Sequence, residues 1–549
     1  MSQAARTSRW TDRRRPTQPA GSAKAYARPV SELMLGPHLL IPLALILGAF
    51  VAFQFFHLTP RYVKLIFGAV FLLVITRLSF AAAMAFFLVI FPAPTFVFIG
   101  DTNVIFIGVM MVAWIVRLGL GLAEKPVRTP IHYAIWVYLL VHVLSFINIT
   151  ENAALLGALR RMSFMTAALL LFVLLVNAFR EEKHLRGGMI ALGVTSLFVS
   201  VTAISEHYFG YRLVPLWFIS GHVALGSLFQ EGGRAGGVFG FHGLLADFSA
   251  MMFYMQLTMA IRARHSLARW SWIVLGGLSL LNIINSANRG GAVIWVLGGL
   301  HLIWLHRRRI HWSIVGASIP ALIGTVFLLS KAQEKVFEHI WLFTRLTQTQ
   351  FERGIPENRV EVWSDVISRI PEHLFLGHGP HIPLERGIGY GMQWPHNAYL
   401  FYLYTTGILG LAAFLWILFK VIYHSAPRGS FSLRRDSLPR AAQAVFHVNV
   451  VMFAFAQLRD EHQRGNVYVY FMWIIFGMAL VATRLVRQEE AARPALLGRS
   501  GFGSDVPPVF ARQWRPPGTR QETGETGETG ETCPPALTAK HGDGMMDRS

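Results

Sequence analysis

Residues 394–422 read WPHNAYLFYLYTTGILGLAAFLWILFKVI. The stretch begins with a Pro-His-Asn cluster and continues from Phe401 to Ile422 as an apolar run. A membrane-spanning helix needs about 20 such residues, so the run is long enough to cross a bilayer. Backbone polar groups in lipid must be satisfied internally, which favours helices over open sheets. The stretch therefore predicts a helical membrane protein with polar side chains at the mouth of one span.

The rest of the chain follows the same pattern. It has 549 residues, of which 53% are hydrophobic and 15% charged. Apolar runs of span length recur and predict an all-α, polytopic transmembrane bundle of about 12–14 spans. The candidate spans are 39–57, 62–78, 80–99, 103–120, 131–149, 162–179, 187–205, 244–261, 270–287, 290–305, 312–330, 397–423, 441–458 and 467–485.

The net charge of +20 is distributed along the chain in a way that predicts topology. Arg6, Arg9 and Arg13 precede the first span, which puts the N-terminus in the cytoplasm by the positive-inside rule. The later basic clusters then fall on the same side. The positive charge is thus explained by membrane topology, and we expect no nucleic-acid partner.

This topology divides the chain into six parts. They are a basic cytoplasmic N-terminal segment (1–35), N-terminal transmembrane helices (36–205), an outer loop with central transmembrane helices (206–330), a large outer loop (331–395), C-terminal transmembrane helices (396–486) and a disordered cytoplasmic tail (487–549). The single cysteine, Cys533, lies in the tail, which excludes a disulfide framework and a cysteine metal site. No His/Asp/Glu spacing suggests a metal site and there is no P-loop, so we expect no cofactor.

Several arginines fall on the outer side, where the topology rule disfavours them, and three of these are candidate ligands. Arg289 stands in an Asn-Arg-Gly-Gly turn between two spans, where the glycines would let a ligand approach a helix N-terminus; the alternative is a snorkelling boundary arginine. Arg359 lies on the apolar face of a helix predicted over 357–370, where a buried guanidinium needs an anionic partner unless it escapes off the helix end. Arg234 lies in a glycine-rich loop whose N–H groups could cradle phosphate or could simply be flexible. The remaining outer arginines are interpreted as solvated loop residues: Arg345, Arg353, Arg369, Arg386, Arg459 and Arg464.

His396 follows a proline suited to the first turn of a helix. The positive end of the helix dipole would disfavour imidazolium and keep a neutral base near pH 7. A neutral histidine can accept a proton from a hydroxyl group. The alternative is that His396 and Asn397 only cap the span, and that His378 is a turn residue.

Together these residues resemble the O-antigen ligase/polymerase (Wzy-C-like) superfamily of bacterial envelope proteins. The resemblance covers about residues 230–425. It rests on three landmarks in order: Asn288–Gly291; Asn358-Arg359 with Trp363 and Leu376-Gly377-His378-Gly379; and Pro395–Leu400 followed by Gly407-Ile408-Leu409-Gly410.

The resemblance implies a GT-C-like helical fold in the bacterial inner membrane, with the active site facing the periplasm. Members of the family transfer a glycan from undecaprenyl pyrophosphate to a periplasmic acceptor such as lipid A–core, without metal or nucleotide. Carried over to this chain, the resemblance implies that Arg289 and Arg359 bind the pyrophosphate. Asn397 and Arg234 would also bind the substrate. His396 would activate the acceptor hydroxyl. We expect direct displacement with inversion. The large outer loop is then periplasmic.

Two alternatives stay open at this point. A polymerase of the same family would use a second lipid-linked glycan as acceptor instead of lipid A–core. A transporter or flippase is an alternative of a different class, but transport predicts ionisable residues in mid-span and internal repeats. The candidate functional charges here lie in outer loops, which favours an enzyme.

Overall fold

The structure is a computed structural model, and the residues that it describes are helical apart from turns, loops and two short antiparallel ribbons. Strand β1 (Thr95–Phe96) pairs with β2 (Gly100–Asp101), and β3 (Phe351–Glu352) pairs with β4 (Ile355–Pro356). The described residues are 79–92, 95–96, 100–150, 152–210, 213, 235–307, 351–352, 355–380, 395–429, 432–459 and 466–499. Outside them lie the predicted spans 39–57, 62–78 and 312–330, the segment 1–35, Arg234 and the chain beyond Arg499.

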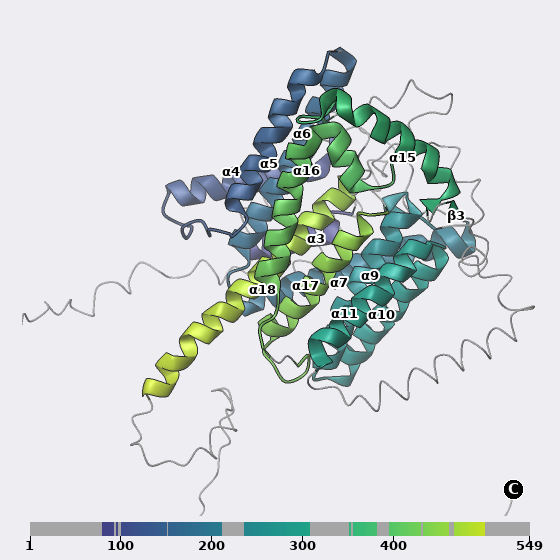
Figure 1. Cartoon of the computed structure of the whole chain (residues 1–549). Coiled ribbons are helices and arrows are strands. Elements are labelled where there is room, and N and C mark those ends of the chain that lie inside the picture. The colour runs from purple at the N-terminus through teal and green to yellow at the C-terminus, as the bar shows by residue number, and fades with distance from the viewer. Residues whose placement is uncertain are drawn as a thin grey trace, which may run out of the picture. The chain divides into compact units, whose positions relative to one another are not determined.

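Seven of the described helices are long and apolar enough to cross a membrane (Figure 1). They are α6 (Asn152–Ala178), α7 (Glu182–Phe209), α9 (His242–Arg262), α10 (Ser266–Asn285), α16 (Ala398–Ser425), α17 (Leu438–Ala456) and α18 (Asn466–Arg499). Shorter apolar helices accompany them: α3 (Phe80–Ile90), α4 (Thr102–Gly119) and α5 (His132–Leu144), which continues into the 3-10 turn η2 (Ser145–Asn148). The prediction of an all-α, multi-pass membrane protein is confirmed, and the total of about 12–14 spans stays a prediction.

Two boundaries differ from the sequence prediction. The predicted span 80–99 is not one helix, because α3 ends at Ile90 just before Pro92, which cannot continue a helix. At the other end of the chain, α18 runs to Arg499 and so extends past the predicted start of the tail at 487.

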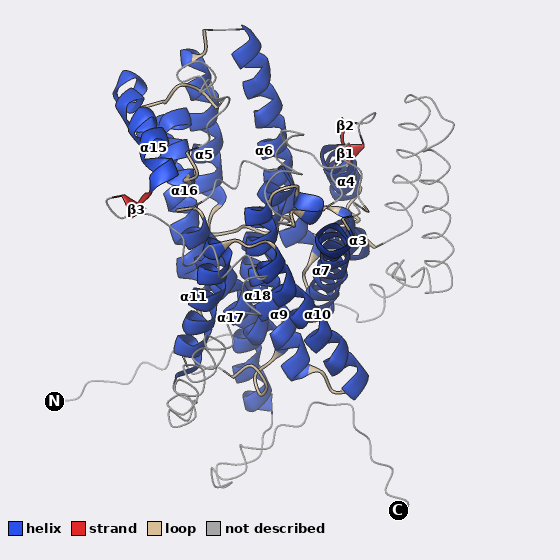
Figure 2. Ribbon diagram, turned by 90° about the vertical axis from the view of Figure 1, so that its right-hand side faces the viewer, coloured by secondary structure: helices blue, strands red, loops and turns tan. Residues whose placement is uncertain are grey.

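Helices α7, α9 and α10 lie side by side in the bundle (Figure 2), and hydroxyl and amide side chains connect them. Gln256 of α9 donates a hydrogen bond to Ser196 of α7 (2.7 Å) and accepts one from Ser279 of α10 (2.9 Å). Further along α10, Asn282 donates to Ser200 of α7 (2.8 Å). All five side chains are buried. Such hydrogen bonds between membrane helices fix the register of the three helices.

The predicted span 397–423 is not one straight helix, because α16 folds back at Gly407. This residue has φ 67° and ψ −170°, outside the helical region. The ring centroid of Phe414 lies 4.4 Å from that of Tyr402 and 6.2 Å from that of Tyr399. A continuous helix would place these pairs ~18 Å and ~22 Å apart along its axis. The short helix 398–406 therefore runs back along the long helix 408–425.

The segment 374–379 fills the break in α16. Four main-chain hydrogen bonds cross it: the N–H groups of His378 and Gly379 donate to the carbonyls of Tyr404 and Thr405 (2.9 Å each), and those of Ile408 and Leu409 donate to Leu374 and Phe375 (2.9 and 3.4 Å). A Cβ on Gly377 or on Gly407 would collide with main-chain atoms of the other segment. The two glycine landmarks of the sequence thus build one structural unit, which restores the hydrogen bonds that the fold-back removes.

We expect Gly407→Ala to destabilise the protein, because the backbone conformation at this position is essentially restricted to glycine. A Cβ would also collide with the carbonyl of Phe375. The expected cost is about 3 kcal/mol, measured as a lower apparent melting temperature in detergent. Gly277→Ala is the matched control, since a Cβ there meets nothing within 4 Å. Equal melting temperatures for the two variants would contradict the fold-back.

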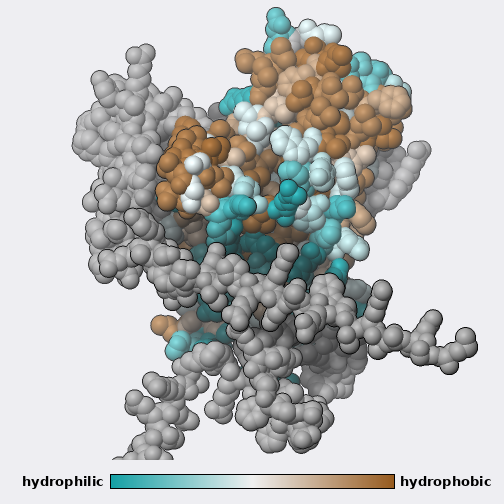
Figure 3. All heavy atoms as spheres, turned by 90° about the vertical axis from the view of Figure 1, so that its left-hand side faces the viewer, coloured by the Kyte–Doolittle hydropathy of each residue, from teal (hydrophilic) through white to brown (hydrophobic). Residues whose placement is uncertain are grey.

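Large apolar side chains remain exposed on α5 and α6. Trp136 and Leu140 of α5 and Leu156 of α6 are 60%, 57% and 71% exposed. Figure 3 faces the side of the molecule on which these helices lie and shows extended hydrophobic surface. Large apolar patches are rare on soluble monomers, so this surface is the one expected to face lipid.

Candidate active site

The turn between α10 and α11 (Arg289–His306) carries the first sequence landmark. The side chain of Asn288 caps α11 by accepting a hydrogen bond from the N–H of Gly291 (2.9 Å). A Cβ on Gly291 would collide with Ala246 of α9, so this glycine allows the close packing of the two helices. Arg289 is half-buried and starts α11, where the helix dipole favours anions.

Arg459 follows the end of α17 and lies beside this turn. Its guanidinium forms an ion pair with Asp247 of α9 and donates a hydrogen bond to the side chain of Asn288. Asp247 is 1% exposed and also accepts a hydrogen bond from Tyr468 (3.3 Å). The Arg459 side chain is only 16% exposed. The interpretation of Arg459 as a solvated loop residue is therefore wrong.

The two glycines after Arg289 serve the protein's own packing. A Cβ on Gly290 would collide with the Arg459 side chain, and the space beside Gly291 is taken by Ala246. The expectation that both glycines leave room for a ligand is therefore replaced. Gly290 is the residue that lets the Arg459 guanidinium reach Asn288.

Arg359 connects the segment that contains His396 with the turn that contains Arg459. It lies in the first turn of α15 (Glu357–Arg369), which confirms the helix predicted over 357–370. Its Nη1 donates to the main-chain carbonyl of Arg459 (3.0 Å) and, at 3.5 Å, to that of His396. These two bonds connect the half-buried guanidinium to main-chain carbonyl oxygens of two segments, and its anionic partner stays a prediction.

The His396 segment is held from several sides. The indole N–H of Trp363 donates to the carbonyl of Pro395 (2.6 Å), and the N–H of Ala398 donates to the carbonyl of Gln457 (2.8 Å). His396 itself has φ 50°, a left-handed conformation that is uncommon for residues other than glycine. Such strain persists where surrounding contacts impose it, and it concentrates at functional sites.

Asn397 is the N-cap of α16. Its Oδ1 accepts hydrogen bonds from the N–H groups of Tyr399 (2.9 Å) and Leu400 (3.2 Å). The helix begins at Ala398, so Pro395 lies outside its first turn, contrary to the sequence prediction. The capping alternative is confirmed for Asn397, while its role in substrate binding stays a prediction.

The glycine-rich loop uses its N–H groups within the protein. Gly236 and Gly237 both donate to the carboxylate of Glu206 at the end of α7 (3.1 and 2.7 Å), and Ala235 donates to the carbonyl of Asn285 (3.1 Å). These groups therefore do not form the phosphate cradle that the sequence suggested. Arg234 lies outside the described residues, and its role stays a prediction.

One end of the bundle thus combines Arg289, Arg359 and Arg459 with His396. Guanidinium groups recognise phosphate oxygens through paired N–H donors, and an imidazole can accept a proton near neutral pH. Among the residues that the structure describes, no group of three or more His, Cys, Asp or Glu side chains could hold a metal ion. The arrangement is suited to bind an anion next to a base.

Two comparisons with known proteins fit this arrangement. A family model described as O-antigen ligase (Wzy_C) matches residues 274–415. An O-antigen ligase from Pseudomonas aeruginosa is 41% identical over 224 residues, which are 39% of this chain and 50% of that protein. Residues 274–415 are thus similar to the O-antigen ligase family. The chain spans about half the length of the curated relative that it matches.

The region matched to the O-antigen ligase family contains most of the predicted site. Arg289, Arg359, His396 and Asn397 all lie within 274–415, as does the break of α16 at Gly407. Arg459 and its partner Asp247 lie outside the matched region, and only the structure brings them to the site.

Proposed function

We propose that this protein is a glycosyltransferase of the O-antigen ligase type. It moves a glycan from undecaprenyl pyrophosphate to a hydroxyl of lipid A–core in the bacterial inner membrane. The observation that carries the proposal is the position of Arg359, which donates to the carbonyls of both His396 and Arg459. The candidate base is His396, and the candidate phosphate ligands are Arg359 and Arg289. Arg459 connects them, because it contacts Arg359 through its carbonyl and Asn288, next to Arg289, through its side chain.

The arginines would bind the leaving group. As the bond between the anomeric carbon and the phosphate oxygen breaks, negative charge grows on the pyrophosphate. Guanidinium groups that are already fixed in place stabilise this charge without reorganising during the reaction. Arg359 is held by its carbonyl acceptors, and Arg289 directly follows Asn288, the cap residue that Arg459 supports.

His396 would act on the acceptor. The acceptor oxygen attacks the anomeric carbon from the face opposite the pyrophosphate, and its proton passes to the imidazole. The new glycosidic bond forms as undecaprenyl pyrophosphate leaves, with inversion at the anomeric carbon. A general base of this kind typically contributes about 10²–10⁴ to the rate.

The charge distribution supports an outward-facing site. Arg262, at the far end of α9, donates to the carbonyls of Leu433 and Asp436, and it interacts electrostatically with Arg186. We call this end of the bundle, with Arg186, Arg262 and Arg440, the basic end. The positive-inside rule puts the basic end in the cytoplasm, so the site at the opposite end faces the periplasm.

A gene deletion viewed by lipopolysaccharide gel tests the proposed acceptor. Loss of all long chains with an intact core supports the ligase, which the name of the Pseudomonas aeruginosa relative also favours. A single repeat unit left on the core would instead indicate a polymerase. Purified protein with lipid-linked donor and lipid A–core must form product without any ion gradient, which a transporter would not do.

We expect Gly290→Ala to reduce transfer strongly, because the added methyl group collides with the side chain of Arg459. The guanidinium would have to leave Asn288 or Asp247, and displacing one positioned group typically costs about 10²-fold. The reconstituted transfer assay measures the effect. Gly108→Ala is the control, since a Cβ there meets nothing within 4 Å. Full activity of the Gly290 variant would show that the position of Arg459 does not matter for transfer.

A further inference from the structure

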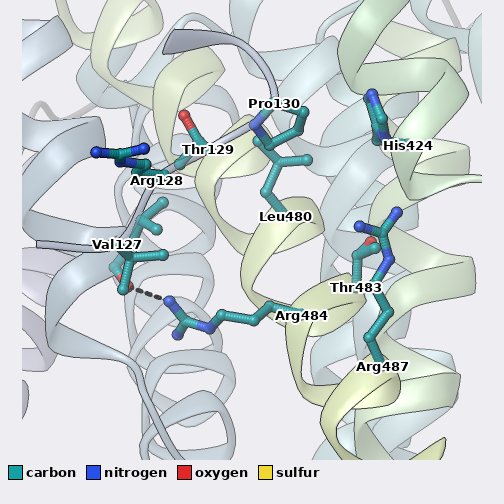
Figure 4. A pocket seen from close by; sticks show the side chains of 10 residues that line it. Val127, Arg128, Thr129, Pro130, His424, Leu480, Thr483, Arg484 and Arg487 are labelled. Atoms are coloured by element: carbon teal, nitrogen blue, oxygen red, sulfur yellow. Dashed lines mark hydrogen bonds between the residues drawn. The ribbon is translucent and has the colours of Figure 1, made fainter. Parts of the chain in front are cut away.

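A second cluster of arginines lies at the basic end, away from the proposed active site. It surrounds a pocket of about 110 Å³ between the segment 127–130, α6, α16 and α18 (Figure 4). The polar lining residues are Arg128, Thr129, His424, Thr483, Arg484 and Arg487. The remaining wall is apolar and consists of Val127, Pro130, Val176 and Leu480.

Arg484 is the fixed member of the cluster. It donates hydrogen bonds to the carbonyls of Val176 (3.0 Å) and Phe179 at the end of α6, and Figure 4 draws the first of these. Its Nε is buried without a hydrogen-bond partner among the described residues, as is Nδ1 of His424. Buried polar groups are nearly always paired, so these two nitrogens are available to a ligand that enters the pocket.

The other two arginines are exposed and carry uncompensated charge. Within the described parts of the chain, Arg128 and Arg487 form no ion pair. The acid close to Arg128 in sequence, Glu124, is paired with Arg180. Lys420 and Arg428 add positive charge around His424. An anion in this pocket would meet only positive or neutral groups among those that line it.

The size of the pocket limits what can enter. Pockets that enclose a whole small molecule usually measure about 300–1,000 Å³. A volume of about 110 Å³ holds a charged group such as a phosphate, with the rest of the ligand outside. The apolar wall suits a ligand whose remainder is apolar.

Exposed aromatic side chains lie close in sequence to two residues that line the pocket. Tyr133 and Trp136 of α5 follow the lining residue Pro130, and Phe419 and Tyr423 of α16 precede His424; their exposed fractions are 75%, 60%, 62% and 57%. Tyrosine and tryptophan gather at the level of lipid headgroups. We therefore expect this part of α5 and α16, and the pocket beside it, to lie near the membrane–water boundary.

We propose that this pocket binds the phosphate of an anionic phospholipid from the leaflet at the basic end. Arg128 and Arg487 contact the phosphate, Arg484 closes the inner end through its Nε, and the acyl chains lie outside along the apolar surface. Basic pockets between transmembrane helices on the cytoplasmic side are suited to such headgroups. The site joins the ends of α6, α16 and α18, and it is independent of the proposed glycan transfer.

Native mass spectrometry of the full-length protein tests the site, with phosphatidylglycerol as the probe. We expect phosphatidylglycerol to bind at least about tenfold more tightly than phosphatidylcholine, because only the former carries net negative charge. The double variant Arg128→Gln/Arg487→Gln should weaken phosphatidylglycerol binding by about 25-fold, since each cation near a lipid surface contributes about fivefold. The matched control is Arg264→Gln/Arg435→Gln, which removes two exposed arginines at the same end.

Three outcomes would overturn the proposal. Equal losses in the test and control variants would indicate general charge attraction. Equal affinity for the two lipids would exclude an anionic headgroup, and displacement of the lipid by an equal concentration of inorganic phosphate would indicate a free-anion site. Hydrogen exchange of the wild type needs no variant: phosphatidylglycerol should protect residues 127–130, and unchanged exchange there would contradict the site.

Discussion

Replacing His396 by asparagine is expected to abolish glycan transfer while the protein still folds. The imidazole is the proposed base, and removing a general base typically lowers the rate about 10²–10⁴-fold. Asparagine tolerates the left-handed backbone conformation that His396 adopts at φ 50°. The variant therefore removes the base without adding backbone strain. The measurement is product formation by purified protein from lipid-linked donor and lipid A–core.

His396→Ala gives a second, separable readout. Alanine in the left-handed region costs about 1–2 kcal/mol, so this variant should lose both transfer and some thermal stability. His373→Ala is the control, because His373 is an exposed histidine on the same side of the bundle. If the asparagine variant retains transfer while the alanine variant loses it, His396 matters for its backbone conformation and the proposed base is wrong.

The apolar pattern of the sequence predicted the helices but not the fold-back of α16. Residues 401–422 are predominantly apolar, and hydropathy does not distinguish a straight span from a hairpin of two helices. The local signals for the fold-back are Gly407 and the glycines within 376–379. Their role is visible only in the structure, where the two segments are in main-chain contact. Main-chain contacts between distant segments cannot be deduced from periodicity.

Arg459 was missed for a different reason. It stands in a short, highly charged outer turn, where a solvated arginine is the usual interpretation. The available signal was its partner: Asp247 lies within the predicted span 244–261, and a carboxylate inside a span requires a cation or a polar neighbour. Looking for that cation would have led to the outer arginines, although not to one of them in particular.

Breaking the Asp247–Arg459 pair is expected to have the largest effect on stability. Arg459→Ala leaves a carboxylate that is 1% exposed without its cation. Removing one partner of a buried ion pair typically costs about 3–5 kcal/mol. The same variant should also lose transfer, because Arg459 supports the Asn288 cap beside Arg289 and packs against Gly290. A single variant therefore cannot separate the two effects.

The double variant Asp247→Leu/Arg459→Met separates them. It replaces both charges by apolar side chains of similar size, and such replacements of a buried pair are often neutral or stabilising. We therefore expect the melting temperature to recover while transfer stays lost, by about 10²–10³-fold, as for the loss of one preorganised donor. Arg459→Lys keeps the charge but not the guanidinium fork that reaches both Asp247 and Asn288, so it should retain more stability than activity. Recovery of both properties in the double variant would mean that Arg459 only holds the fold. Recovery of stability alone would make Arg459 a positioning residue of the proposed site.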